Sequence, residues 1–165
     1  MPMSQGPVRK ILLFVDGSEE CITAAQYAVV LARTLGAELA ALYVVNVSVL
    51  NELFKARIFI KMEQMDYEHD LEQDGRRYLN YISELGRAKG VSIETHIEKG
   101  VVNEVVVEKA RILGADLLAM GELEPIKSRS DAFHDESELI LRKAHCSVLV
   151  VKDADYIERL YQAME

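Results

Sequence analysis

The chain has 165 residues, of which 50% are hydrophobic, and its formal net charge is -8 at pH 7. This composition predicts one globular domain with an apolar core and excludes a disordered chain. An acidic chain without a Lys/Arg-rich stripe is poorly suited to a phosphate backbone, so we expect no nucleic-acid partner. No run approaches the roughly 20 apolar residues of a membrane span, and residues 1–8 form a flexible lead rather than a signal peptide. We therefore expect a cytoplasmic protein without a membrane partner.

A continuous apolar run at residues 9–15 predicts the first strand. Because apolar residues do not alternate with polar ones, this strand should be buried on both faces. The run ends at Asp16, Gly17 and Ser18, and Ser18 is well placed to cap the helix that follows. Small apolar residues recur in that helix at helical spacing as far as Gly36, which predicts close packing against a sheet.

Residues 38–45 predict the second strand. Residues 46–60 are too apolar for a bare solvent loop, and we expect them to cover the sheet edge or to form a partner surface. Residues 61–89 have a long helical pattern with an acidic first half. A helix of that extent reaches about 40 Å, well beyond a strand of about 20 Å, so its start should project past the sheet or be broken.

Residues 91–98 alternate between apolar and polar side chains, which is typical of a half-exposed edge strand. The polar set includes His96, which we expect to be solvated. Residues 101–113 contain three successive valines, but their apolar positions follow the 3.6-residue period. This period predicts a helix that ends at Gly114.

A short apolar run at residues 116–120 ends at Gly121 and predicts a fourth buried strand. A polar loop follows, then a helical pattern from about residue 135, and then an apolar strand at residues 146–151. Ligands of open parallel sheets bind beyond the carboxyl ends of the strands. The loop that begins at Gly121 is therefore the expected place for a functional site.

The last segment, residues 153–165, predicts an amphipathic helix that lies on a surface. Its apolar stripe consists of Ile157, Leu160, Tyr161 and Met164. Five strands that alternate with four helices predict an α/β fold, a doubly wound five-stranded parallel sheet over residues 9–152. The chain has no convincing internal repeat.

Four segments in this order resemble the universal stress protein family: ILLFVDGSEE, LGAELAALYVV, GADLLAMG and AHCSVLVVK. The resemblance implies a Rossmann-like sheet of order 3-2-1-4-5 and a homodimer joined through the last strand. That strand consists of Cys146, Ser147, Val148, Leu149, Val150 and Val151. Ser147 stands where many members have proline, and this departure restores a backbone N–H to the edge without threatening the fold.

Members of this family that bind ATP have a loop of the form Gly, two residues, Gly, nine residues, Gly and then Ser or Thr. Here the corresponding positions are Gly121, Glu124, His134 and Asp135, so the spacing survives but three of the four residues differ. The resemblance therefore implies a degenerate phosphate site.

The loop residues also disfavour phosphate on physical grounds. Glycines let backbone amides approach phosphate oxygens, whereas Asp135 and Glu138 are suited to cap the following helix themselves. Glu122, Glu124 and Glu136 add negative charge near the same place. A carboxylate about 5 Å from a phosphate oxygen repels it by roughly 3 kcal/mol at an effective dielectric of about 20. Lys127 and Arg129 offset part of this if the loop folds inward.

The nucleoside half of the family's site is better preserved. By resemblance, Asp16 with the adjoining Gly17 and Ser18, Val44, and the pair Met120 and Gly121 match positions near base and ribose. Each residue also has an ordinary structural explanation, because a strand end needs a turn and a sheet needs a core. Binding of ATP, AMP or a nucleoside stays open as an alternative to a chain without a cofactor.

Catalysis has no candidate constellation. Ser18 lacks the second glycine of a nucleophile elbow, and the turn lacks the Gly-Lys ending of a P-loop. His134, Asp135 and Glu136 are adjacent at a helix start and point in different directions, so we expect no metal site. Cys21 and Cys146 are expected to be reduced thiols. The sequence thus favours a non-catalytic, homodimeric stress-response module; the alternative is an adenine-nucleotide sensor, and slow nucleotidase activity has only fold analogy behind it.

Overall fold

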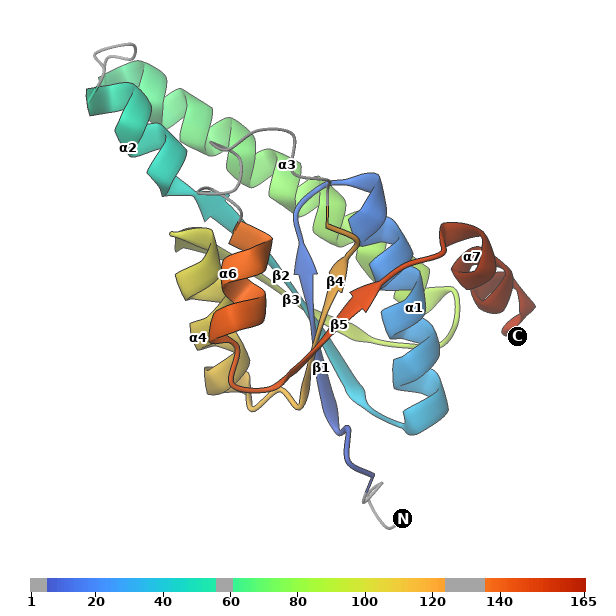
Figure 1. Ribbon diagram of the computed structural model, residues 1–165. Helices are drawn as coiled ribbons and strands as arrows, with labels where there is room; N and C mark the ends of the chain where they lie inside the picture. The colour runs from blue at the N-terminus through green and yellow to red at the C-terminus, as the bar shows by residue number, and fades with distance from the viewer. Residues whose placement is uncertain (1–5, 56–60, 124–135) are drawn as a thin grey trace.

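The computed structural model describes residues 6–55, 61–123 and 136–165, and it contains a five-stranded parallel sheet of order β3-β2-β1-β4-β5 (Figure 1). The strands are β1 (Lys10–Val15), β2 (Glu38–Asn46), β3 (Ile93–Gly100), β4 (Leu117–Gly121) and β5 (Ser147–Val151). The helices are α1 (Glu19–Leu35), α2 (Val47–Lys55), α3 (Lys61–Arg87), α4 (Val102–Leu113), α6 (Glu136–Lys143) and α7 (Ala154–Ala163). The predicted fold class and strand order are confirmed.

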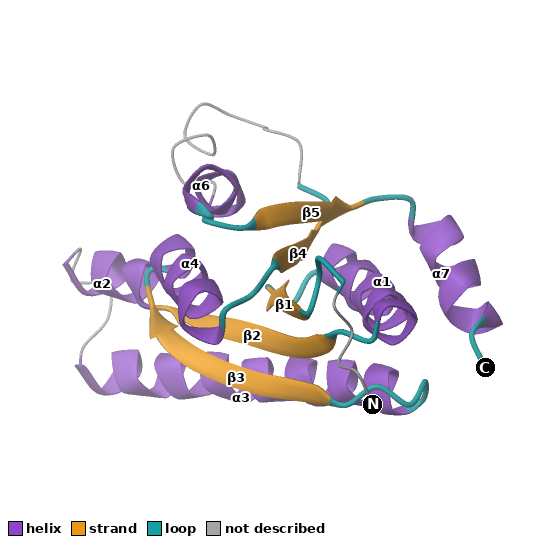
Figure 2. Cartoon of the chain, turned by 90° about the horizontal axis from the view of Figure 1, so that it is seen from below, coloured by secondary structure: helices purple, strands orange, loops and turns teal. Residues whose placement is uncertain are grey.

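One face of the sheet packs against α1, and α3 and α7 complete that side (Figure 2). Ile11, Leu13 and Val15 of β1 point to this face and are fully buried. The buried side of α1 is rich in alanine, which lets the helix approach the strands closely. The small apolar residues predicted for this helix therefore form one half of the core.

The other face packs against α4 and α6 (Figure 2). Leu12 and Phe14 alternate with the first set along β1 and belong to this second core. Val106 of α4 and Ile140 of α6 are fully buried against it. Because helices cover both faces, β1 has no solvent face, which explains its continuous apolar sequence.

The predicted helix ends are confirmed at three positions. Ser18 Oγ accepts a hydrogen bond from the Cys21 backbone N–H at 3.2 Å, as an N-cap residue does. Gly36 ends α1 with φ 66°, and Gly114 ends α4 with φ 67°. Both glycines adopt the left-handed conformation that side chains with a Cβ rarely adopt.

Two helices account for most of the described residues between β2 and β3. Residues 47–55, which the sequence left without a secondary structure, form α2, and α2 contacts α3 and β3. The 27-residue α3 is continuous, and its start extends with α2 beyond the sheet (Figure 1). Lys99 of β3 and Glu68 of α3 form an ion pair at 2.7 Å near this extension. The expectation of a projecting start is therefore confirmed.

The C-terminal helix α7 lies against α1 and the end of α3. Ile157 and Tyr161 are buried at 3% and 5% exposure. The Tyr161 hydroxyl donates to the Leu85 carbonyl at 2.7 Å, and Lys89 Nζ donates to the Met164 carbonyl at 2.5 Å. The predicted amphipathic tail thus covers a surface of its own domain.

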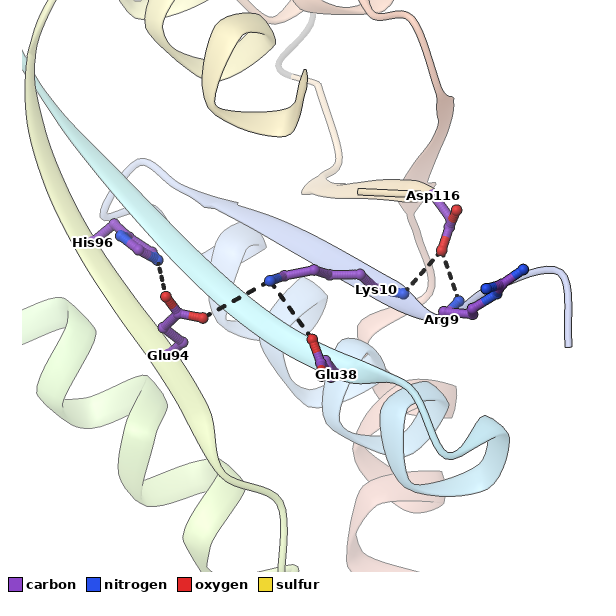
Figure 3. A network of polar contacts seen from close by, with 6 residues as sticks. All are labelled: Arg9, Lys10, Glu38, Glu94, His96 and Asp116. Atoms are coloured by element: carbon purple, nitrogen blue, oxygen red, sulfur yellow. Dashed lines mark hydrogen bonds and ion pairs between the residues drawn. The ribbon is translucent and has the colours of Figure 1, made fainter. Parts of the chain in front are cut away.

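A polar network joins the strands at the amino end of the sheet (Figure 3). Asp116 Oδ2 accepts the backbone N–H groups of Arg9 and Lys10 at 2.8 and 3.0 Å, and these bonds hold the pKa of the Asp116 carboxyl below its ordinary value. Lys10 Nζ lies 3.6 Å from Glu38 and 3.9 Å from Glu94. The network lies at the opposite end of the strands from the expected ligand site and serves the fold.

The expectation that His96 is solvated is wrong. Its side chain is only 19% exposed, and Nε2 lies 3.0 Å from a Glu94 carboxylate oxygen without hydrogen-bond geometry. His96 is in register with Leu42, whose side chain belongs to the core beneath α4. The polar side chains of β3 therefore lie on the side of the sheet that α4 covers. Lys109 of α4 reaches the same face and binds Glu98 at 2.9 Å.

Candidate functional site

A cavity of about 260 Å³ opens at the carboxyl ends of β1 and β2, next to the starts of α4 and α6. This is the end of a parallel sheet at which ligands bind. Its described wall residues come from both strands and from three helices: Phe14, Val15, Asp16, Tyr43, Val44, Asn46, Leu71, Val102, Glu136 and Ser137. Of the predicted nucleoside residues, Asp16 and Val44 are among them.

The turn from Asp16 to Ser18 is fixed by its own hydrogen bonds. Asp16 Oδ1 accepts from the Ser18 backbone N–H at 2.9 Å and from Ser18 Oγ at 2.5 Å. Gly17 has φ 84°, and a Cβ at this position would lie 2.6 Å from the Tyr78 ring. Gly17 is therefore required by the backbone and by the aromatic ring above it, whereas the Asp16 carboxylate stays at the cavity wall.

Tyr43 is a cavity residue that the sequence reasoning missed. It is 9% exposed, and its ring lies 6.0 Å from the ring of Tyr78. Gly75 of α3 makes room for it, because a Cβ there would clash with the Tyr43 ring. Burial, followed by the nearby Tyr78 and Asp74, raises the pKa of the Tyr43 hydroxyl, which therefore stays neutral. The preceding apolar run gave no sign that this side chain would border a ligand site.

Glu136 has a role that its sequence position did not reveal. The N-terminus of α4 begins at Val101, which offers no side-chain acceptor. Instead Glu136 Oε2, in the first turn of α6, accepts the backbone N–H and the side-chain Nδ2 of Asn103, both at 2.7 Å. Lys143 Nζ donates to Asn103 Oδ1 at 2.9 Å, so this buried amide is satisfied on both sides. A carboxylate from one helix thus caps another helix beside the cavity.

Met120 and Gly121 have structural positions. Met120 is 1% exposed and belongs to the core beneath α4 and α6. A Cβ at Gly121 would lie 2.6 Å from the Glu20 backbone carbon, so only glycine lets the end of β4 pass the start of α1. Glu122 lies 4.0 Å from Lys152. The predicted phosphate-loop residues Glu124, His134 and Asp135 lie outside the described residues.

The two cysteines are free thiols. Burial and the adjacent Asp16 raise the pKa of Cys21 to about 11, and burial also raises that of Cys146. Such thiols are poor nucleophiles at neutral pH. Within residues 6–55, 61–123 and 136–165, no group of three or more His, Cys, Asp or Glu side chains could hold a metal ion. No helix in these ranges has the length and apolar character needed to cross a membrane.

The predicted dimer strand is the outermost strand of the sheet on the side of β4. Along β5, Ser147 is exposed, Val148, Leu149 and Val150 are half-buried, and Val151 is buried. Cys146 precedes the strand and is half-buried. One edge of β5 pairs with β4 over its full length.

Comparison with known proteins agrees with this architecture. The universal stress protein family model matches residues 7–152. A universal stress protein from Methanocaldococcus jannaschii is 31% identical over 144 residues, which cover 87% of this chain and 82% of that protein. Among solved structures, a universal stress protein family member from Burkholderia pseudomallei is 25% identical, with a TM-score of 0.69 over 90% of this chain and 98% of that one. UspA from Lactobacillus plantarum has a TM-score of 0.72 at 19% identity, over 90% of this chain and 100% of its own. The chain belongs to the universal stress protein family.

Proposed function

We propose that the protein is a non-catalytic regulatory module of the universal stress protein family whose cavity does not hold the triphosphate of ATP. The observation that carries this proposal is the Glu136 carboxylate, which lies on the cavity wall and already accepts the α4 backbone N–H that an anion would use. Neither Cys21 nor Cys146 is among the described wall residues, and the pKa of each thiol is raised above its ordinary value.

The size of the effect follows from Coulomb's law. A phosphate oxygen about 5 Å from this carboxylate is repelled by roughly 3 kcal/mol at an effective dielectric of about 20. Each 1.4 kcal/mol corresponds to about tenfold in affinity, so one such charge weakens phosphate binding by roughly a hundredfold. Removal of the charge should recover part of that loss.

Titration calorimetry with ATP, ADP, AMP and adenosine tests the proposal, together with mass spectrometry of small molecules released from the purified protein. We expect no ATP binding up to millimolar concentration in the unmodified chain. Glu136→Gln keeps an acceptor for Asn103 but removes the charge, and it should bind ATP more tightly than the unmodified chain does. Stoichiometric ATP in the purified protein would contradict the proposal.

An adenine-nucleotide sensor is the second candidate. Asp16 and Val44, which match base and ribose positions of the family, both border the cavity. A universal stress protein family member from Arabidopsis thaliana has been solved with AMP bound, at 19% identity and a TM-score of 0.62 over 90% of this chain and 94% of that one. Another universal stress protein has been solved in complex with cAMP. Micromolar binding of AMP or cAMP in the same titration would favour this candidate. No detectable binding up to millimolar concentration would exclude it.

We further propose a homodimer joined through β5, because this strand lies at the edge of the sheet and carries half-buried apolar side chains. Light scattering across a dilution series should give twice the chain mass at micromolar concentration. A monomer at that concentration would count against the β5 dimer but would leave the ligand proposal untouched. We expect the protein to act in the cytoplasm.

A further inference from the structure

A groove runs between α3 and the outer strand β3, at the opposite edge of the sheet from β5. It consists of two hollows of about 320 and 400 Å³, and both elements line each of them. The first lies at the middle of α3 and of β3, and the second at the last turns of α3 and the start of β3. Because α3 runs along β3 (Figure 2), the second hollow continues the first.

The strand side of the groove is a sheet edge with unpaired backbone groups. Within the described residues β3 pairs with β2 alone, and no backbone group of residues 93–100 bonds to the main chain outside the sheet. Alternate residues of such a strand direct their N–H and C=O groups away from the sheet. Half-buried Ile93 and Ile97 and exposed Thr95 line the groove from this strand. An extended chain is the partner that matches this row of donors and acceptors.

The helix side of the groove carries positive charge. Arg76, Asn80, Ser83 and Arg87 line it, and their spacing of four, three and four residues places them on one face of α3. A guanidinium therefore lies toward each end, with an amide and a hydroxyl between them. The described lining contains no Asp or Glu, although the net charge of the whole chain is -8.

Both guanidinium groups keep donors for a ligand. Arg76 Nη2 donates to Glu72 at 3.1 Å, and Arg87 Nη2 donates to Glu84, so each arginine has one partner on its own helix. The arginine side chains are 58% and 75% exposed, and exposed ion pairs within one helix are weak. A guanidinium has five N–H donors in a planar fork, and this fork matches a carboxylate. The groove is thus complementary in charge to an acidic segment.

We propose that this groove binds an extended acidic segment of a partner protein, which adds to the outer edge of β3 as a further strand. Alternate side chains of a strand share a face, so Asp or Glu at every second position would reach Arg76 and Arg87. The inference deepens the proposed regulatory role by giving it a partner surface, and it does not involve the cavity at Glu136. A dimer through β5 would leave this edge open, because the two strands lie at opposite edges.

Calorimetric titration of the full chain with synthetic peptides tests the proposal. The probes are acetylated and amidated peptides of the length of β3, in which glutamate alternates with valine, threonine or tyrosine. Matched peptides carry glutamine or lysine in place of glutamate. We expect at least one glutamate peptide to bind at submillimolar concentration, at least about tenfold tighter than its glutamine or lysine counterpart. Absence of binding by every glutamate peptide up to millimolar concentration would overturn the inference.

Backbone methylation separates strand addition from simple charge attraction. One peptide is methylated on the backbone nitrogen of every glutamate, and another on that of every intervening residue. Only one of these sets can face β3, so one peptide should lose binding while the other keeps it. In amide hydrogen exchange followed by NMR, the unmethylated peptide should protect alternate amides of β3. Equal binding by the two methylated peptides, or no added protection in β3, would contradict strand addition.

Two variants and one matched control locate the acidic side chains. Arg76→Gln and Arg87→Gln should each weaken the glutamate peptide by about three- to tenfold and leave the glutamine peptide unaffected, with thermal melts to verify folding. Arg77→Gln makes the same charge change on the next residue of α3, which is 77% exposed and outside the described lining. This control should leave the affinity unchanged. Equal weakening by Arg77→Gln would overturn the site, because it would reduce the effect to net charge.

A second copy of the chain is the other extended partner for this edge. Protection of the β3 amides that rises with protein concentration, without any peptide, would identify that partner and overturn the proposal of an acidic segment. The two proposals also fail separately. Absence of peptide binding leaves the proposed function standing, whereas binding of ATP contradicts the proposed function and leaves the β3 groove untouched.

Discussion

Replacement of Glu136 by alanine should destabilise the protein far more than an ordinary surface substitution. The change removes two hydrogen bonds from Glu136 Oε2 to Asn103, both at 2.7 Å. Hydrogen bonds to charged groups contribute about 1.5–3 kcal/mol each, and a buried donor left without a partner costs a further 1–3 kcal/mol. Glu136 is half-buried and water can replace part of the loss, so we expect a total of about 2–4 kcal/mol. For a chain of this size that corresponds to a fall of roughly 5–15 °C in Tm.

Thermal and urea unfolding measure this loss, with two matched variants beside it. Glu136→Gln retains an acceptor for Asn103, and its loss of stability should be less than about half that of Glu136→Ala. Glu104→Ala removes an exposed carboxylate from the same first turn of α4 and should cost about 0.5 kcal/mol or less. In a double-mutant cycle with Asn103→Ala, the coupling should reach at least about 1 kcal/mol. Indistinguishable stabilities for Glu136→Ala and Glu104→Ala would refute the assignment of Glu136 as the cap of α4.

Three further predictions concern the core, the pH response and the thiols. Gly121→Ala places a Cβ 2.6 Å from backbone and should cost about 1–3 kcal/mol in urea unfolding; an unchanged midpoint would contradict the close approach. The folded pKa of Asp116 lies below the unfolded value of about 3.9, so its contribution to stability is complete above that pH and is lost as pH falls through the folded pKa. Asp116→Asn should therefore have a lower free energy of unfolding than the unmodified chain at pH 7, and this difference should narrow below about pH 4. A difference that stays constant with pH would contradict a contribution from the Asp116 carboxylate. In alkylation at pH 8, half-buried Cys146 should react before Cys21, whose thiol is buried and has a pKa of about 11, and faster labelling of Cys21 would contradict that order.

The elements that the sequence predicted are those in which one periodicity decides the structure. The continuous run of β1 and the 3.6-residue spacing of α4 each have one physical explanation, so strand and helix followed directly. The helix α2 was missed because β2 leads into it without a glycine or proline. Its signal was Asn46, whose Oδ1 accepts the Ser48 backbone N–H at 3.0 Å, as a capping residue does. His96 was placed in solvent because alternation shows which side chains share a face but not what covers that face.

In the candidate site, too, local patterns predicted some residues and missed others. Asp16 and Val44 could be assigned to the carboxyl end of the sheet because strand ends locate them. The pairing of Glu136 with Asn103 joins residues 33 positions apart through two helices packed side by side. A local sequence pattern spans only a few residues, so it could not predict this pairing. A partial signal was available in Val101, since a helix that begins without a side-chain acceptor needs its cap from elsewhere.

Glu136 therefore links the stability of the domain to the chemistry of the cavity. A phosphate could use the α4 N-terminus only if this carboxylate withdrew, and withdrawal would leave the buried Asn103 amide without its acceptor. Small neutral or cationic ligands impose no such exchange, because the carboxylate does not repel them and Oε2 can keep both bonds to Asn103. The cost of withdrawal adds to the direct repulsion of phosphate, so a substitution that removes only the charge should recover only part of the phosphate affinity. A variant that combines Glu136→Gln with a phosphate-binding loop would bind ATP tightly only if it reduced both the repulsion of phosphate and the cost of withdrawal.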